Sequence, residues 1–367
     1  MFTTHPYYPE WRRKTKVSPW RIQEESLHHV RLIRHGLHLP ANPSRLTPRL
    51  LYELSFTASL CRSSFRAVRF DAVMVYCPMP GAVMFAALRK LMRNEPLWLN
   101  GQDIPADAAA ASGISQSGTF DWMANWAQRL SSNRADVWST ISPVMTERLA
   151  PLRNRKQPLH FCPNWLNGSL AECVKGLPSK AGRVPSSPVK LIYAGNIGKE
   201  QGLQEFCQQL AKSSLPFQFH IYGSRGVAGV IQAWVAGGKD PRFRFAGFLE
   251  EPAFAQALHD TDIFVITEKP GAGASFIPSK LIPCIASGTP VLAICDRSGP
   301  LGREMADAGL GCVIEWSEFH EIEFKIGQLT HDFQMCQQRC LAHARDYTSE
   351  VAVERFDVLL RQMVFEL

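Results

Sequence analysis

Short apolar runs alternate with segments of helical periodicity along the whole chain. Uninterrupted apolar runs are typical of parallel strands that helices cover on both faces. In the first half, this pattern predicts strands at His29–Arg34, Asp71–Cys77, Pro96–Asn100, Val137–Ile141 and Leu159–Cys162. Between them it predicts helices near Thr47–Arg62, Ala82–Met92 and Gly118–Leu130. The first half is therefore predicted to be an α/β domain.

Residues 175–188, which are rich in Gly, Pro, Ser and Lys, interrupt this alternation as a linker does. The alternation then restarts, and it predicts strands at Val189–Ala194, Phe217–Tyr222, Phe243–Ala246, Asp262–Thr267, Pro290–Ile294 and Gly311–Glu315. Helices are predicted near Leu203–Ala211, Gly226–Val235, Glu251–Leu258 and Ser279–Ala286, with a long terminal helix over much of Phe319–Phe365. The predicted divisions are an N-terminal domain (1–174), the linker (175–188), a C-terminal domain (189–345) and a C-terminal helix (346–367). Doubly wound sheets of this kind bind nucleotides beyond the carboxyl ends of their strands.

The composition is that of an ordinary globular protein, with 46% hydrophobic and 20% charged residues. A chain of 367 residues is too long for one core and fits about two domains. The ten cysteines form no CxxC pair, which favours reduced thiols and a cytoplasmic protein. The uncharged stretch 72–88 contains two prolines and is shorter than the roughly 20 residues of a spanning helix, so it predicts strand, turn and helix.

Positive charge is concentrated at the start of the chain. Residues 1–70 hold 12 Lys or Arg and 4 Asp or Glu, a net of +8, whereas the whole chain carries +7. Such a region suits peripheral contact with an anionic membrane or a lipid-phosphate acceptor, and a solvated basic face is the alternative. No nucleic-acid-binding motif accompanies the charge, so nucleic acid is not an expected partner. The eleven histidines show no HxxxH or HExxH spacing, so no metal site is predicted.

Two loops of the second half have the character of phosphate sites. Ser279 and Lys280 stand at the entrance of a short predicted helix, where unpaired N–H groups and the helix dipole favour an anion. Lys280 adds a full positive charge there. The second loop follows an apolar strand and contains Gly195, Asn196, Gly198 and Lys199. Its glycines permit close backbone approach, although a purely structural turn is the alternative. Two such loops in one α/β domain suggest a bound nucleotide diphosphate.

Further candidate residues follow other predicted strands. Gly223 lies in a turn where backbone N–H groups can meet a ligand, and Phe248 is placed to pack against a base; a plain connection and core packing are the alternatives. Glu268 and Ser275 belong to the long loop 267–280 and are predicted to hold sugar hydroxyls, the alternative being a surface loop. Asp103 follows a strand of the first half and is predicted to point into the cleft between the domains, unless it is a cap or turn residue.

Together these segments resemble the retaining glycosyltransferases of family 4, especially bacterial exopolysaccharide and O-antigen enzymes of the colanic acid type. The resemblance covers nearly the whole chain and rests on short motifs in a shared order: Pro6–Trp11, Leu51–Phe56, Gln102–Pro105, Pro163–Trp165, Gly195–Gly198, Gln201–Leu203 and Pro278–Leu281. It implies the GT-B fold, in which two Rossmann-like doubly wound domains face a cleft. It also implies that the family's opening strand, glycine loop and helix are missing before Thr3, which would leave the N-terminal domain incomplete.

The resemblance implies that a sugar moves from a nucleotide diphosphate donor to a lipid-linked or polysaccharide acceptor, with retained configuration and generally without metal. The C-terminal domain would bind the donor and the N-terminal domain the acceptor, in the biosynthesis of exopolysaccharide, capsule or O-antigen. Lys280, Ser279 and the 195–199 loop would face the diphosphate and stabilise its leaving charge. Gly223 and Phe248 would lie near the nucleoside. Asp103, close to the donor sugar or acceptor, and Lys280 are the predicted catalytic residues.

The chain departs from the family at several positions. A spaced pair of glutamates found in many members is replaced by Ser275 and Pro283, and the usual Arg and Lys of the glycine loop by Asn196 and Gln201. Lys280 therefore carries more of the expected phosphate binding. These changes motivate a second hypothesis, a non-catalytic glycosyltransferase-like subunit that binds a partner enzyme. A sugar-nucleotide epimerase is a third, which would need carboxylate and histidine constellations that the sequence does not show.

Overall fold

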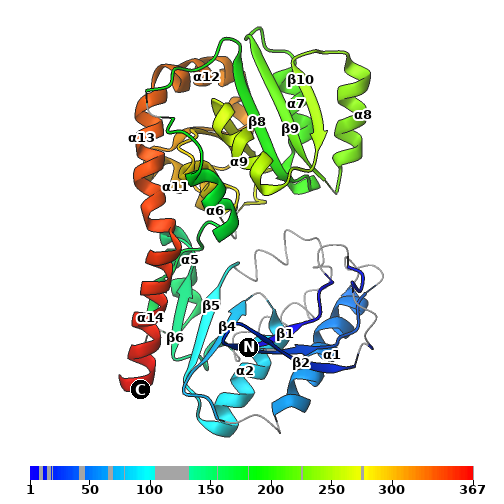
Figure 1. Ribbon diagram of the computed structural model, residues 1–367, viewed down its shortest axis with the longest axis vertical. Coiled ribbons are helices and arrows are strands. Elements are labelled where there is room, and N and C mark those ends of the chain that lie inside the picture. Colours follow the sequence, from blue (N-terminus) through cyan, green and yellow to red (C-terminus); the bar gives the residue numbers. More distant parts are fainter. Residues whose placement is uncertain are drawn as a thin grey trace. The chain divides into compact units, whose positions relative to one another are not determined.

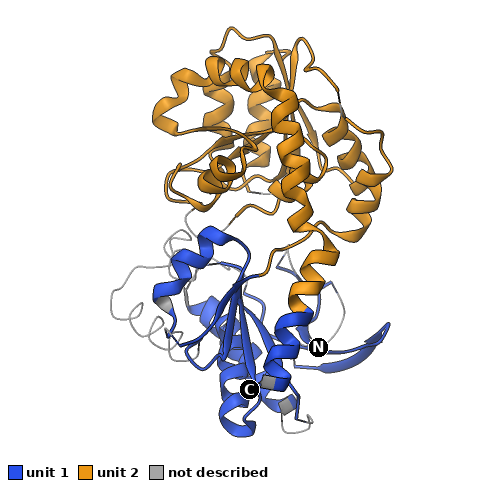
Figure 2. Ribbon diagram, turned by 90° about the vertical axis from the view of Figure 1, so that its left-hand side faces the viewer, with its two compact units in different colours: residues 1–161, 357–367 blue, residues 162–356 orange. Residues whose placement is uncertain are grey.

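The computed structural model describes residues 1–7, 11–14, 18, 20–40, 46–64, 69–77, 79–103, 132–154, 156–180, 182–224, 226–273 and 277–366. The predicted helix Gly118–Leu130 and the candidate residue Ser275 lie outside these ranges. The chain forms two compact α/β units (Figures 1 and 2). Unit 1 comprises Met1–Phe161 with Asp357–Leu367, and unit 2 comprises Cys162–Phe356. No helix within the described ranges is both long and apolar enough to cross a membrane.

Unit 1 contains two sheets. The first has the order β1-β3-β2, with β1 (Phe2–Thr4) parallel to β3 (Val30–His35) and β2 (Ile22–Leu27) antiparallel to it. The second is parallel with the order β4-β5-β6-β7: β4 (Val73–Cys77), β5 (Leu97–Gly101), β6 (Val137–Thr140) and β7 (Leu159–Phe161). The five strands predicted in this half are confirmed. β1 and β2 were not predicted, because β1 has only three residues and the largely exposed hairpin arm β2 carries no apolar run.

Helices cover the strands of unit 1 through two apolar cores. One core joins the second sheet to Val83 of α2 (Pro80–Arg93) and to Met145 of α5 (Pro143–Leu149), which the turn η1 (Ala150–Leu152) follows. The other joins α1 (Leu46–Ser64) to Phe85 on a further side of α2. Burial of these apolar side chains is the main stabilisation of each layer.

Unit 2 is built on one parallel sheet of six strands with the order β10-β9-β8-β11-β12-β13 (Figure 1). The strands are β8 (Val189–Asn196), β9 (Phe217–Ser224), β10 (Phe243–Gly247), β11 (Ile263–Thr267), β12 (Val291–Ile294) and β13 (Gly311–Ile314). From β8 the chain adds strands first on one side and then, from β11 onward, on the other. The strand order thus reverses between β8 and β11, and ligands of open α/β sheets bind outside the carboxyl ends of strands at such a point.

The helices of unit 2 lie on both faces of this sheet. They are α6 (Gly168–Lys175), α7 (Leu203–Leu210), α8 (Ala228–Gly238), α9 (Glu251–Asp260), α10 (Leu281–Ala286) and α11 (Pro300–Ala308), with short 3-10 turns η2 (Lys199–Gln201) and η3 (Trp316–Glu321). On one face, α7, α8 and α12 (Ile322–His331) share a core with β8 and β9 that includes the wholly buried Tyr193, Phe206 and Phe219. The strands and helices predicted in this half before residue 315 are confirmed, with ends that shift by a few residues.

The single terminal helix predicted over Phe319–Phe365 is wrong. The structure has α12, α13 (Phe333–His343) and α14 (Ser349–Glu366), with the 3-10 turn η4 (Ala344–Tyr347) between the last two. The buried Glu304 of α11 accepts hydrogen bonds from His343 Nε2 at 2.7 Å and from the Tyr347 hydroxyl at 2.5 Å. These bonds fix η4 against α11. The helical periodicity continues on both sides of η4, so the sequence pattern does not reveal the interruption.

Unit 2 already begins before the predicted linker 175–188. Helix α6 packs on α9, where the Asn167 amide donates to Glu251 Oε1 at 2.7 Å. Within the linker itself, the buried Lys180 Nζ donates to Thr289 Oγ1 at 2.7 Å and to the Leu258 carbonyl. This ammonium caps the end of α9, so a stretch with linker composition is fixed to the second core.

Candidate functional site

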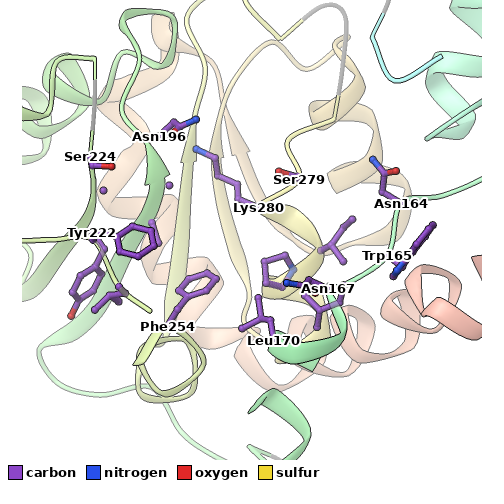
Figure 3. A pocket seen from close by; sticks show the side chains of 18 residues that line it. Asn164, Trp165, Asn167, Leu170, Asn196, Tyr222, Ser224, Phe254, Ser279 and Lys280 are labelled. Carbon is purple, nitrogen blue, oxygen red and sulfur yellow. The ribbon is translucent and has the colours of Figure 1, made fainter. Parts of the chain in front are cut away.

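A cavity of about 770 Å³ opens in unit 2 beyond the carboxyl ends of β8 and β9 (Figure 3). It therefore lies beside the point where the strand order reverses. Its wall consists of residues from the segment before and within α6, the ends of β8 and β9, the loop after β10 with α9, and the entrance of α10: Asn164, Trp165, Leu166, Asn167, Leu170, Ala194, Gly195, Asn196, Tyr222, Gly223, Ser224, Phe248, Leu249, Phe254, Ser279, Lys280, Ile282 and Pro283. The fold thus gathers segments that are far apart in sequence into one concave surface.

Six of the residues predicted from the sequence meet in this wall: Gly195, Asn196, Gly223, Phe248, Ser279 and Lys280. Three others, Gly198, Lys199 and Glu268, are not part of it. Asp103 belongs to unit 1, and Ser275 lies outside the described residues. The functional roles of all these residues remain predictions.

Two glycines let the strand ends approach each other at the cavity. Gly195 has a φ of 139°, which disfavours any side chain, and a Cβ there would lie 3.7 Å from Lys280 Nζ. A Cβ on Gly223 would lie only 2.3 Å from the Gly195 carbonyl oxygen. The glycines therefore keep the ends of β8 and β9 close together and leave backbone bare beside the lysine.

Lys280 is the cation of the cavity. Its Nζ donates to the Tyr193 hydroxyl at 3.0 Å and lies 4.3 Å from the centre of that ring. Burial lowers the pKa of this ammonium to about 8, while Glu268, the Cys284 thiol and Glu200 act to raise it. A partly desolvated ammonium is a strong ligand for an incoming anion, because little water remains to screen it.

The start of α10 attracts an anion less strongly than was predicted from the sequence. The helix has six residues, and its first amides already bond within the turn, from Leu281 to the Pro278 carbonyl at 2.9 Å and from Ile282 to the Ser279 carbonyl at 3.3 Å. Few N–H groups are left there for a ligand. The charge of Lys280 is therefore the main attraction for an anion at this point.

Glu268 lies behind the wall rather than in it. Its side chain is buried, its Oε2 fills the space that a Cβ on Gly273 would occupy, and its Oε1 has no hydrogen-bond partner among the described residues. Burial raises the pKa of this carboxyl to about 7; the nearby Lys280 opposes that rise and Asp296 adds to it. Glu268 thus lies against the loop 269–273, and its charge raises the pKa of Lys280.

The rest of the wall is largely aromatic and apolar. Tyr222, Phe248 and Phe254 offer ring faces and edges, and 70% of Phe248 is exposed. Trp165, the last residue of the motif Pro163–Trp165, belongs to the wall and packs edge-on against Phe356, with 6.1 Å between the ring centres. No role was predicted from the sequence for Tyr222 or Phe254. Tyr222 directly precedes Gly223 at the end of a strand, and this position could have indicated that it lines the site.

Asp103 follows β5 in unit 1 and is half-buried. Burial raises the pKa of its carboxyl. Burial also raises the pKa of Cys77 at the end of the neighbouring strand β4, with a contribution from the Asp103 charge, to about 12. Asp103 thus lies at the carboxyl edge of the parallel sheet of unit 1, the edge where such sheets carry functional groups. No cluster of three or more metal-ligating side chains occurs within the described part of the chain.

Unit 1 has a parallel sheet and unit 2 a doubly wound sheet with a lysine-bearing cavity at its strand-order reversal, which is the architecture of α/β proteins that bind a ligand beyond the carboxyl ends of their strands. Two family models match the chain: "Glycosyl transferase 4-like domain" over residues 2–165 and "Glycosyl transferases group 1" over residues 188–332. The chain belongs to this glycosyltransferase family, and it is a glycosyltransferase with the GT-B fold.

Its relatives agree with this assignment. The chain is 26% identical over 318 residues to WcaI of Escherichia coli, whose name describes a colanic acid biosynthesis glycosyl transferase, and the match covers 83% of this chain and 76% of WcaI. Sucrose-phosphate synthase from Thermosynechococcus elongatus has a similar fold, with a TM-score of 0.68 at 15% identity over 99% of this chain and 88% of that one. Anabaena HepE, solved in complex with UDP, has a TM-score of 0.63 at 14% identity over 85% and 84% of the two chains.

Proposed function

We propose that this enzyme transfers a sugar from a nucleotide diphosphate donor to a lipid-linked or polysaccharide acceptor, with retention, in bacterial exopolysaccharide, capsule or O-antigen biosynthesis. The named role of WcaI supports the pathway. The UDP complex of HepE supports a nucleoside diphosphate as the group to be bound. No metal is part of the proposed reaction. A cytoplasmic location with peripheral contact at the membrane is proposed from the basic start of the chain.

One observation carries the proposal: the Lys280 ammonium lies over bare backbone at Gly195, inside a cavity with aromatic walls. A diphosphate fits the ammonium and the exposed strand ends, and a nucleoside base fits Tyr222 and Phe248. As the glycosidic bond breaks, negative charge grows on the leaving diphosphate. The fixed positive charge of Lys280 stabilises that charge without reorganising solvent. In this proposal Asp103 is placed near the donor sugar or the acceptor.

Calorimetric titration with UDP, GDP and ADP tests the donor class. We expect one nucleoside diphosphate to bind, and at 100 times its dissociation constant to stabilise the protein by about 2.7 kcal/mol. Lys280→Ala should weaken binding at least tenfold, because a charge-assisted contact to phosphate is lost. Lys212→Ala is the matched control, since Lys212 is exposed beyond the far end of α7 and bonds only Gln209 among the described residues.

Turnover and stereochemistry require the sugar nucleotide and an acceptor. Proton NMR of the product made from an α-linked donor should show an α-linked sugar if configuration is retained. A β-linked product would refute retention, and absence of binding by every nucleoside diphosphate would refute the donor class. Binding without turnover on any lipid-linked or polysaccharide acceptor would favour the non-catalytic subunit instead.

A further inference from the structure

One tyrosine links the two loops that meet at the cavity. Tyr193 belongs to β8 and is completely buried, and its hydroxyl contacts Lys280, which lines the cavity. That oxygen lies 3.0 Å from Lys280 Nζ, 2.6 Å from the Asn196 carbonyl oxygen and within hydrogen-bond distance of Gln201 Oε1. A single atom thus contacts the lysine before α10 and both ends of the loop after β8.

The hydrogen-bond directions at this oxygen are fixed by chemistry. An ammonium has only donors, so Lys280 must donate to the hydroxyl. The hydroxyl has one proton, which it donates either to the Asn196 carbonyl or to Gln201 Oε1. The ring of the same tyrosine lies beneath the ammonium at 4.3 Å and attracts it through its negative face. One residue therefore holds the lysine charge by two independent interactions.

Core packing alone does not require this hydroxyl. Phenylalanine fills comparable positions of the same core at Phe206, Phe217 and Phe219. A buried hydroxyl without hydrogen-bond partners destabilises the fold, so a buried tyrosine is expected only where its oxygen forms hydrogen bonds. Gln201 Oε1 and the Asn196 carbonyl oxygen are the two acceptors for the proton of the Tyr193 hydroxyl, and a proton donated to either leaves a lone pair for Lys280.

We propose that Tyr193, held by Gln201, is a positioning residue that fixes the Lys280 ammonium in its charged form for the donor diphosphate. This inference rests on the proposed function. When the donor binds, the ammonium keeps its bond to the hydroxyl and points its other N–H groups toward the phosphate oxygens, while the ring remains beneath it. Tyr193 also joins the lysine to the Asn196 backbone, so the two loops take up their binding positions together.

The groups that set the charge of Lys280 come from several elements. Glu268 at the end of β11, Glu200 in η2 and the Cys284 thiol in α10 all face it, and Asp296 acts on Glu268. The pKa of Lys280 is about 8 in these surroundings. Donor binding that needs the ammonium should therefore weaken as the pH rises through about 8. Loss of the tyrosine hydroxyl removes an acceptor for the charged form, so this weakening should move to lower pH.

The experiment compares Tyr193→Phe with the wild-type protein and with Tyr347→Phe. The control also loses a buried hydroxyl, which bonds Glu304 in the same unit but outside the cavity wall. Titration calorimetry with UDP and GDP over a range of pH is the readout. We expect Tyr193→Phe to weaken binding about tenfold and to shift its alkaline limb downward. Tyr347→Phe should lower the melting temperature and leave both binding properties unchanged.

A second readout needs no nucleotide. Reductive methylation with 13C-formaldehyde labels the lysines for NMR titration, and the Lys280 signal is the one that Lys280→Arg removes. The pKa of Lys280 should fall in Tyr193→Phe, because the ammonium loses its hydroxyl acceptor. It should fall less in Gln201→Leu, because the hydroxyl remains and still has the Asn196 carbonyl as an acceptor for its proton. Unchanged lysine titration in Tyr193→Phe, or unchanged UDP and GDP affinity and pH profile, would overturn the inference. Failure of the wild-type protein to bind any nucleoside diphosphate would instead overturn the proposed function, and the NMR titration would still decide the link between Tyr193 and Lys280.

Discussion

At the scale of single residues, the site depends on a few positions where size and charge are tightly set. Gly195 is bare because its φ of 139° disfavours a side chain, and Gly223 is bare because a Cβ there would lie 2.3 Å from the Gly195 carbonyl oxygen. Glu268 and Lys280 are ionisable groups that burial pushes toward their neutral forms, with pKa values of about 7 and about 8. Small changes at these positions should affect binding and stability in separable ways.

Gly195→Ala should weaken nucleoside diphosphate binding and also cost about 1–2 kcal/mol of stability, because a side chain at a φ of 139° is strained. Gly182→Ala is the control, since Gly182 has a φ of 77° and a Cβ there would meet no atom within 4 Å. Urea denaturation and calorimetry should show a stability loss in both variants and a binding loss only in the first. Equal binding by the two variants would contradict the role given to the strand end.

Glu268→Gln should change the pH dependence of stability. The folded protein holds the Glu268 proton up to a pKa of about 7, whereas the unfolded chain releases it near the ordinary glutamate pKa of 4.5. Between these values the native state binds more protons, so the wild-type protein loses stability as the pH rises from about 4.5 to about 7. The variant lacks this slope, which amounts to roughly 2–3 kcal/mol.

Urea denaturation at pH 5 and pH 8 measures that difference for Glu268→Gln. Glu200→Gln is the control, because it removes an exposed carboxylate instead of a buried one. The variant should gain stability relative to wild type at pH 8 and little at pH 5. Parallel stability profiles for wild type and Glu268→Gln would rule out a native-state pKa near 7.

At the scale of elements, the termini of the chain's last helices are set by side chains far away in sequence. Glu304 of α11 holds η4 through His343 and Tyr347, and the backbone amide of Leu166 in the cavity wall bonds the Tyr347 carbonyl at 3.4 Å. A buried carboxylate thus anchors a turn that in turn contacts the wall.

Glu304→Gln should destabilise unit 2 by about 2–3 kcal/mol, because the hydrogen bonds from His343 and Tyr347, which both end on Glu304 Oε1, lose their charged acceptor. Glu354→Gln on the exposed face of α14 is the control and should change stability by less than about 0.5 kcal/mol. Differential scanning calorimetry gives both values. A melting temperature as high as that of the wild type would show that the carboxylate does not anchor η4.

At the scale of the whole molecule, each unit has apolar packing of its own. Helix α14 is divided between them, with its residues up to Phe356 in unit 2 and those from Asp357 in unit 1. Its last residues belong to unit 1, where Met363 is 1% exposed, although the rest of that unit ends at Phe161. Two cores of this kind are expected to unfold as separable cooperative blocks.

Met363→Ala should therefore lower the stability of unit 1 by about 2–5 kcal/mol through the cavity that it leaves. Val364→Ala, at a neighbouring position that is 41% exposed, is the control and should have a much smaller effect. Calorimetry with and without UDP or GDP separates the units, because a ligand of the unit 2 cavity stabilises only the transition of unit 2. Destabilisation of the ligand-sensitive transition by Met363→Ala would contradict this assignment.

The sequence by itself determined the α/β class, nearly all strands and the loops that carry Gly195, Gly223 and Lys280. It could do so because apolar runs, glycines and short motifs are local properties of the chain. It missed the breaks between the final helices, since the Glu304 contact that holds the turn η4 is not local. Only the tertiary structure put Tyr193 beneath Lys280, moved Glu268 behind the wall and brought Trp165 into it. Those relations depend on which strands are neighbours and on how deeply each charge is buried, and both are decided by packing between distant segments.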